Sequence, residues 1–282
     1  MKQKTVIIQF KSRTNSYTIR PHYLYLQQVF KAVKIYILDF ENNKNYKEEL
    51  KEITSNCNVY IESTFIERIK DIKKELSNRD NIVFLKANEK VIEFFNNKYE
   101  CYLFLKANGF KQESTYKLKD NKLVFPYILK TLDGDKGEEV WKIHNLKELE
   151  EICENRDIDN LITQRYNDNS FGRDIRVVVI NGIAYPLLRI GKKGSFKSNI
   201  SLGGKVEVLN DFPLFFREEI TRLTEALKDK FKSDFDNEYY AIDLFDDGSF
   251  NIIEMNDSPG LSNAKDIFPD LDLNIKQLYS NL

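Results

Sequence analysis

Short β-branched runs alternate with stretches of helical period up to Leu85, and this alternation limits the N-terminal part of the chain to few folds. It is typical of a parallel sheet covered by helices, because parallel neighbours need a long crossover connection. Between the last two runs, apolar residues recur at helical spacing from Phe65 to Leu76. The predicted strands are Val6–Phe10, Lys34–Leu38, Asn58–Ile61 and Ile82–Leu85.

The loop after the first predicted strand is a candidate for substrate binding. Open sheets of this kind bind ligands beyond the carboxyl ends of their strands. Arg13 and Arg20 lie in or next to that loop and would suit a substrate carboxylate. The alternative is a solvated polar loop.

The pattern changes beyond about residue 90 to hairpins and isolated helices. A helix-period stretch from Glu89 to Asn108 ends at Gly109, which suits a helix C-terminus. A second amphipathic helix is predicted from Ile220 to Phe231. The predicted strands of this part are Pro126–Lys130, Leu161–Tyr166, Asp174–Ile180, Ala184–Ile190, Tyr239–Phe245 and Phe250–Met255.

A hairpin near the C-terminus carries two carboxylates and an amide. Asp247-Gly248 between two apolar runs is a strong hairpin turn. Glu254 and Asn256 share a strand face; a two-residue loop places Asp243 diagonal to Glu254, and a four-residue loop places it directly opposite. Such oxygen ligands suit Mg²⁺. The alternative is an ordinary amphipathic hairpin with solvent-facing acids.

A second pattern suggests phosphate binding. The predicted strand that ends in Lys130 is followed by a glycine-containing turn that includes Gly134 and Gly137. Glycines let backbone N–H groups approach phosphate oxygens, and a lysine on a strand adds a fixed positive charge. The chain lacks both the Walker and the dinucleotide-binding motifs. A plain surface turn is the alternative.

Between these two patterns lies a stretch rich in basic residues. Strand alternation sets Asp174 and Arg176 on one face, and the next strand delivers Arg189. A basic loop follows at residues 191–199. Together Arg176, Arg189, Lys192 and Lys197 would neutralise the charge on a transferring phosphoryl group and an attacked acyl carbon. A solvated basic face is the alternative.

Composition excludes some classes of partner. The 43 basic and 44 acidic side chains nearly cancel, so no global field favours nucleic acid or an anionic membrane. The three cysteines are far apart in sequence, which fits a reducing compartment. We see neither a signal h-region nor an apolar run of membrane-spanning length. We therefore expect a cytoplasmic protein without a nucleic-acid or membrane partner.

From about Asn97 to Leu261, the chain resembles the ATP-grasp superfamily, and within it the RimK-type ribosomal-protein glutamyl ligases. This resemblance implies an α/β fold in which two α+β subdomains, at 91–168 and 169–282, clasp ATP. An N-terminal parallel-sheet domain at 1–90 precedes them. The motifs that carry the resemblance are Asn97-Lys98, Pro126–Lys130 with its glycine loop, Leu161–Tyr166, Gly172–Arg176, Phe196–Asn199 with Gly203-Gly204, Asp243 and Glu254–Gly260.

The resemblance also implies roles for single residues. Lys98 and Lys130, with the glycine loop, contact the ATP phosphates, and Asp174 lies near the ribose. Glu139 stands where the family usually has a further glycine, and Arg165 stands where an acidic residue is common. Gln164, Arg165 and Tyr166 line the adenine pocket, Arg189 and Asn199 lie by the γ-phosphate and the acyl intermediate, and Asp243, Glu254 and Asn256 hold Mg²⁺, with Mn²⁺ as an alternative ion. Together with Arg176 and Lys192 from the basic stretch, Arg189 and Asn199 form the candidate catalytic set.

The activity implied is an ATP-dependent carboxylate–amine ligase. It would activate a carboxylate as an acyl phosphate, let an amine displace phosphate, and release ADP. Its substrates would be small molecules, amino acids or peptides, and a homo-oligomer is left open. Two alternatives remain: a kinase on the same fold, and a nucleotide-binding module without catalysis.

Overall fold

The structure is a computed structural model, and it describes residues 4–10, 21–40, 43–61, 65–134, 137–209, 211–235, 239–257, 259–260 and 267–278. The chain forms two compact units. The first comprises Met1–Glu93, Ser233–Glu238 and Ser258–Leu282, and the second comprises Phe94–Lys232 and Tyr239–Asp257. Arg13 and Arg20, proposed above for a substrate carboxylate, lie outside the described residues.

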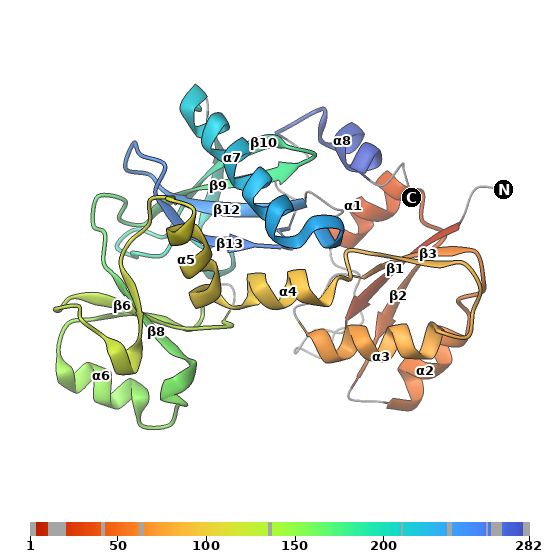
Figure 1. Ribbon diagram of the computed structural model, residues 1–282, viewed down its shortest axis with the longest axis horizontal. Helices are drawn as coiled ribbons and strands as arrows, with labels where there is room; N and C mark the ends of the chain where they lie inside the picture. The colour runs from red at the N-terminus through yellow and green to blue at the C-terminus, as the bar shows by residue number, and fades with distance from the viewer. Residues whose placement is uncertain are drawn as a thin grey trace. The chain divides into compact units, whose positions relative to one another are not determined.

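The first unit contains the predicted parallel sheet. Its strand order is β2-β1-β3-β4, and every neighbouring pair is parallel. Helices α2 and α3 lie together on one face of the sheet, and α1 and α8 lie together on the other (Figure 1). The strands are β1 (Lys4–Phe10), β2 (Lys34–Leu38), β3 (Cys57–Ile61) and β4 (Ile82–Leu85), and the helices are α1 (Pro21–Phe30), α2 (Asn43–Lys51), α3 (Ile66–Leu76) and α8 (Leu271–Leu278).

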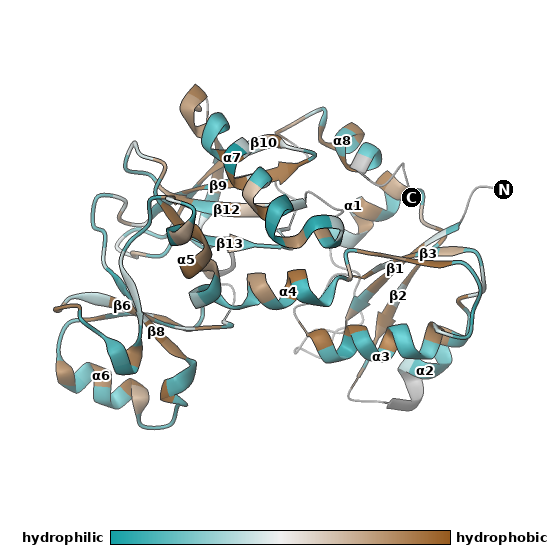
Figure 2. Ribbon diagram, in the orientation of Figure 1, coloured by the Kyte–Doolittle hydropathy of each residue, from teal (hydrophilic) through white to brown (hydrophobic). Residues whose placement is uncertain are grey.

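Alternation along the strands explains the core of this unit. Val6 and Ile8 alternate along β1 and therefore point to the same face of the sheet. They are buried in one cluster with Ile69 and Ile72 of α3. Figure 2 shows α3 with hydrophobic and hydrophilic residues in alternation, as expected for a helix that buries one side. The predicted parallel sheet is confirmed.

The helical stretch predicted from Glu89 to Asn108 is two helices, α4 (Glu89–Asn96) and α5 (Lys98–Ala107). Asn97 separates them because its backbone is extended and its side chain accepts hydrogen bonds from the N–H groups of Tyr99 and Glu100, both at 3.1 Å. Such an N-cap stabilises the start of a new helix. The helix start at Asn97-Lys98 is thus present, whereas the single long helix is not.

The second unit contains two antiparallel sheets. The five-stranded sheet has the order β11-β10-β9-β12-β13, and the four-stranded sheet has the order β5-β8-β6-β7. The larger sheet consists of β9 (Arg173–Ile180), β10 (Ile183–Ile190), β11 (Lys205–Val208), β12 (Tyr239–Phe245) and β13 (Ile252–Asn256). The smaller consists of β5 (Thr115–Lys117), β6 (Tyr127–Thr131), β7 (Val140–Ile143) and β8 (Leu161–Arg165).

Helix α7 (Leu214–Phe231) packs on one face of the larger sheet. The hydroxyl groups of Thr224 on α7 and Tyr240 on β12 lie 2.7 Å apart, so the even-numbered side chains of β12 face this helix. Asp243 therefore points to the opposite face. Among the described residues, no helix has the length and apolar character needed to cross a membrane.

Candidate nucleotide and metal site

The strand pairing of the larger sheet brings predicted site residues onto the face away from α7. Arg176 on β9 is paired with Asp243 on β12, which lies directly opposite Glu254 on β13. This is the register expected of the longer hairpin loop, and a bulge follows Asp243. Two residues before Arg176 on β9, Asp174 is paired with Arg189 on β10. The residues on this face are Asp174, Arg176, Arg189, Asp243, Glu254 and Asn256.

A buried ion-pair network connects four of them. Arg176 donates from Nε and Nη2 to the two oxygens of Asp243, at 2.8 and 2.7 Å. Arg189 donates from Nη2 to Asp243 at 2.7 Å, and from Nε and Nη2 to Asp174, both at 2.6 Å. The Ser198 hydroxyl also donates to Asp174. Two guanidinium groups thus balance two carboxylates, as buried charges require.

The network keeps Asp243 ionised. Burial alone would raise the pKa of Asp243, because it disfavours the charged form. The charges of Arg176 and then Arg189 outweigh burial and hold the pKa well below its usual range. Asp243 is therefore a permanent anion that neighbouring cations stabilise.

Glu254 and Asn256 lack the partners that Asp243 has. Among the described residues, Glu254 has no hydrogen-bond or ion-pair partner, and the buried Nδ2 atom of Asn256 is without a hydrogen bond. Because the amide orientation is interchangeable, the Asn256 oxygen can take that position. A carboxylate offers about four lone pairs, and Asp243 uses three, so one is left for a metal ion.

These three oxygen donors fit Mg²⁺, which accepts one or two carboxylates and completes its shell with water and phosphate. They do not form an all-protein metal cage. Within the described part of the chain, no group of three or more His, Cys, Asp or Glu side chains is placed to hold a metal ion.

The predicted phosphate-binding lysine, Lys130, is buried on β6. Its Nζ donates to Gln164 Oε1 at 3.0 Å. Burial lowers the pKa of Lys130 to about 8, and the nearby charge of Lys98 lowers it too, whereas Glu254 opposes this shift. These four residues line one cavity of about 10 Å³, with Ile162 and Met255 among its apolar walls.

Lys98 contacts the glycine-containing loop. Its Nζ donates to the carbonyl oxygens of Leu132, at 3.2 Å, and Gly134. Farther along that loop, Gly137 has φ of +73°, and a Cβ atom there would lie 2.5 Å from Asn199 Oδ1. Lys197 Nζ donates to the Gly137 carbonyl at 2.7 Å. The glycine loop therefore contacts the 191–199 loop directly.

The remaining predicted residues lie apart from this network. The Lys192 side chain packs against Gly203, where an added Cβ would lie 2.4 Å from Lys192 Cε. Arg165 is largely exposed, with its Nε atom 4.0 Å from Glu113 Oε2. The Tyr166 ring lies 3.7 Å from Lys142 Nζ.

Ser198 was not singled out from the sequence. It lies within the Phe196–Asn199 motif, and its buried hydroxyl bonds to Asp174. In the sequence, Ser198 stands between Lys197 and Asn199 in a basic loop, and this context is only a weak indication of a role in the site. Its partner is identified only by the hydrogen bond in the folded structure to Asp174 on β9.

Residues 106–278 match the RimK-like ATP-grasp domain family. An uncharacterized protein of Mycoplasma genitalium is 24% identical over 259 residues, covering 83% of this chain and 86% of that protein. The coenzyme gamma-F420-2:alpha-L-glutamate ligase of Methanocaldococcus jannaschii is 25% identical over 203 residues, covering 67% of this chain and 67% of that protein. N-acetylaspartylglutamate synthase A of Homo sapiens is 31% identical over 143 residues, but these cover 49% of this chain and only 34% of the human protein.

Solved structures show the same fold. The D-alanine–D-alanine ligase of Bacillus anthracis has a TM-score of 0.65 at 14% identity and covers 99% of this chain and 96% of its own. The L-amino acid ligase of Bacillus licheniformis has a TM-score of 0.62 at 15% identity, covering 99% and 75%. The ordered motifs, the two antiparallel sheets and the family match over residues 106–278 show that this chain belongs to the RimK-like ATP-grasp family.

Proposed function

We propose that this chain is an ATP-dependent ligase that joins a carboxylate to an amine through an acyl phosphate, releasing ADP and phosphate. The observation that carries the proposal is that Lys98, Lys130 and Glu254 line the same cavity. Glu254 stands on the sheet face that also carries two arginines and Asp243. The proposed phosphate-binding lysines and the proposed metal-binding oxygens therefore lie within one unit, and this unit contains most of the match to the RimK-like ATP-grasp family.

The nucleotide would enter the cavity between α5, β8 and β13. Pockets for ligands of this size measure about 300–1,000 Å³, so the walls of this cavity must separate when ATP binds. Lys98 and Lys130 would then hold the phosphates, and the backbone from Gln164 through Arg165 to Tyr166 would line the adenine. Asp174 accepts three hydrogen bonds already, which leaves one lone pair for the proposed ribose contact.

The metal ion would be held by Asp243, Glu254 and Asn256. When bound, Mg²⁺ withdraws negative charge from the phosphate oxygens and orients them. Two observations support this proposed metal binding. Glu254 has no competing partner among the described residues, and Asp243 stays ionised.

The arginines would stabilise the charge that develops during transfer. Arg176 and Arg189 are held rigidly by Asp243 and Asp174, and such preorganised donors cost little reorganisation during reaction. Asn199 touches the glycine loop and would meet the γ-phosphate, and Lys192, which packs against Gly203 outside the arginine network, would add positive charge from the same 191–199 loop. In this proposal, residues 91–168 and 169–282 supply the two subdomains that clasp ATP, although the described residues 259–260 and 267–278 group with the first unit.

The test is an ADP-release assay with Mg²⁺ across amino acids and peptides, followed by mass measurement of the product. If the chain is a ligase, ADP and phosphate should form only when both a carboxylate and an amine are present. The mass of the product should equal the summed masses of the two substrates minus one water. A stable phosphorylated product without free phosphate would identify a kinase instead. No substrate-dependent ADP in the whole panel would favour a module without catalysis.

A further inference from the structure

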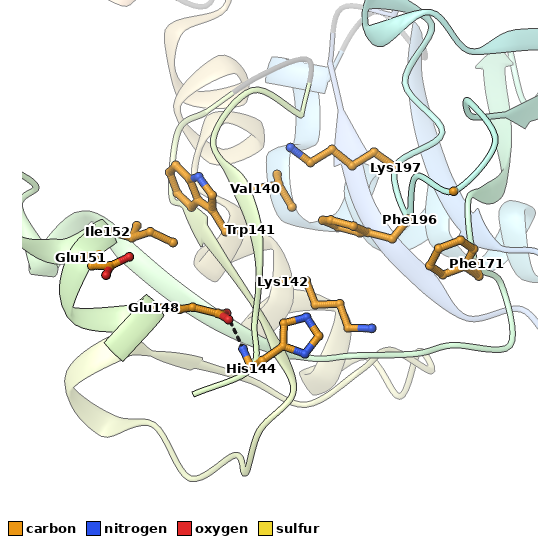
Figure 3. A pocket seen from close by; sticks show the side chains of 11 residues that line it. Val140, Trp141, Lys142, His144, Glu148, Glu151, Ile152, Phe171, Phe196 and Lys197 are labelled. Carbon is orange, nitrogen blue, oxygen red and sulfur yellow. Dashed lines mark hydrogen bonds between the residues drawn. The ribbon is translucent and has the colours of Figure 1, made fainter. Parts of the chain in front are cut away.

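A groove of about 520 Å³ lies in the second unit outside the proposed nucleotide cavity. One wall comes from β7 and α6 (Leu146–Cys153), and the other from Phe171 and the 191–199 loop (Figure 3). Its volume is in the range of protein ligand sites. No residue of this groove lines the cavity that holds Lys130 and Glu254.

The groove runs along a free strand edge. Strand β7 is the last in the order β5-β8-β6-β7, so its pairing with β6 leaves the other edge without a strand partner among the described residues. Successive residues of a strand point to opposite faces. A groove touched by Val140, Trp141 and Lys142 in turn must therefore follow the edge itself. Free edges of this kind accept an extended peptide as an added strand.

Apolar side chains flank this edge on both sides. Trp141 and Ile152 lie on the side of the smaller sheet, and Phe171 and Phe196 face them across the groove (Figure 3). Phe171 is 48% exposed despite its size. Such rings would pack against alternate side chains of an added strand, which gives the groove a preference for apolar residues at every second position.

The charged side chains of the groove balance formally, but they lie on different sides of it: Glu148 and Glu151 are on α6, whereas Lys142 is on β7 and Lys197 is on the 191–199 loop. Glu148 is engaged at the start of α6, where it accepts from the His144 N–H at 2.8 Å and from Asn145 Nδ2 at 3.1 Å. Glu151 lies 3.8 Å from Lys147. In contrast, Lys142 and Lys197 have no carboxylate partner in the described part of the chain.

The Lys197 end of the groove meets the glycine loop. Lys197 Nζ binds the Gly137 carbonyl, and Val140 follows that loop directly. We propose that this groove binds an extended polypeptide segment with alternating acidic and apolar residues, as an added strand on β7. If the proposed function holds, the segment is a substrate, and the groove directs its carboxylate toward the glycine loop.

Trp141 is the only tryptophan of the chain, so its fluorescence reports on the groove directly. The probe is the peptide Glu-Leu-Glu-Leu-Glu, acetylated at its N-terminus and titrated without nucleotide. We expect saturable change in Trp141 emission, and we expect Lys142→Glu to weaken binding about tenfold or more, because like charges then face each other. Lys122→Glu makes the same charge change on an exposed residue outside the groove and should bind as the parent does.

Two further peptides test the mode of binding. In an added strand, alternate N–H groups point toward β7 and the others point away. One peptide is N-methylated at its first, third and fifth amides, and the other at its second and fourth. We expect the two peptides to differ in affinity, because only one of them loses the N–H groups that bond to β7. Equal binding of the two methylated peptides would overturn strand addition. Binding of Lys-Leu-Lys-Leu-Lys as tight as that of the acidic peptide, or a flat titration with the acidic peptide, would overturn the proposed occupant. The measurement needs no turnover, so a failure of the ligase assay leaves it unaffected.

Discussion

The guanidinium group of Arg176 binds both oxygens of Asp243 across neighbouring strands, at 2.8 and 2.7 Å. This pairing changes the electrostatics of the predicted metal site. Two carboxylates on one sheet face would repel each other without a metal ion. Here the arginines on β9 and β10 supply the compensation. Asp243 therefore supports the fold as well as the proposed metal binding.

The first prediction concerns the stability of this network. Asp243→Asn leaves two guanidinium groups short of a carboxylate, one of them on the fully buried Arg189. Removing one partner of a buried ion pair costs about 3–5 kcal/mol, because the remaining charge stays desolvated. Chemical unfolding followed by circular dichroism would measure the loss.

Asp246→Asn is the matched control. Asp246 also pairs with an arginine of β9, Arg173 at 2.8 Å, but both side chains are partly exposed. Exposed pairs contribute about 0–1 kcal/mol. Equal losses in the two variants would contradict the role given to the buried network.

The second prediction separates metal binding from stability. Glu254 is partly exposed and has no partner among the described residues. Glu254→Gln should therefore change the free energy of unfolding by about 0.5 kcal/mol or less, as for an ordinary surface change. It should lower the rate of ADP formation by about 100-fold or more, since one charged ligand of the proposed magnesium site is lost.

Titration of activity with Mg²⁺ provides the readout, and the variant should need more metal. Glu207→Gln serves as control, because Glu207 is an exposed strand glutamate of the same sheet, paired with Lys205. Full turnover in Glu254→Gln at the metal concentration that saturates the parent would sink the metal assignment.

Local sequence patterns were sufficient for elements with uninterrupted β-branched runs. The strands at Lys34–Leu38, Ile82–Leu85 and Tyr239–Phe245 have the predicted bounds. Strands β7 and β11 were not predicted, because both are short and interrupt their apolar residues with charged ones, Lys142 in β7 and Lys205 and Glu207 in β11. The equally short strand β4 is an uninterrupted apolar run and was predicted.

The arginine–carboxylate network could not be predicted from local sequence. Alternation placed Asp174 and Arg176 on one face correctly. Their partners depend on β9 lying between β10 and β12, and Asp243 is 67 positions from Arg176 in sequence. No periodicity encodes such long-range pairing. The sequence therefore indicated which residues are special and not which of them bind each other.

The third prediction concerns pH. Burial lowers the pKa of Lys130 from its ordinary 10.5 to about 8. Lys130 is therefore charged below about pH 8, and its proposed hold on ATP phosphates should weaken as the pH rises through that value. The folded state also loses this proton before the unfolded state, so the contribution of Lys130 to the free energy of unfolding rises between about pH 8 and pH 10.5.

The dissociation constant for ATP, measured by calorimetry from pH 7 to 9.5, tests this. In the parent it should rise above pH 8, whereas Lys130→Met should bind weakly at every pH. Lys119→Met, at an exposed lysine of the same unit, should keep the parental profile. A pH profile in Lys130→Met that matches the parent would exclude Lys130 as the titrating group.

The fourth prediction concerns contact between the two loops. Gly137 has φ of +73°, where a side chain is strained, and an added Cβ would lie 2.5 Å from Asn199 Oδ1. Gly137→Ala should displace Asn199 from the glycine loop. A displacement of about 1 Å at a reacting group costs up to about 100-fold in rate, so kcat/KM for ATP should fall markedly.

Gly248→Ala introduces the same kind of backbone strain, at φ of +77°, but no atom lies within 4 Å of its Cβ position. It should lower stability by about 1 kcal/mol and leave kcat/KM unchanged. An equal loss of activity in both variants would assign the effect to backbone strain and not to the contact with Asn199.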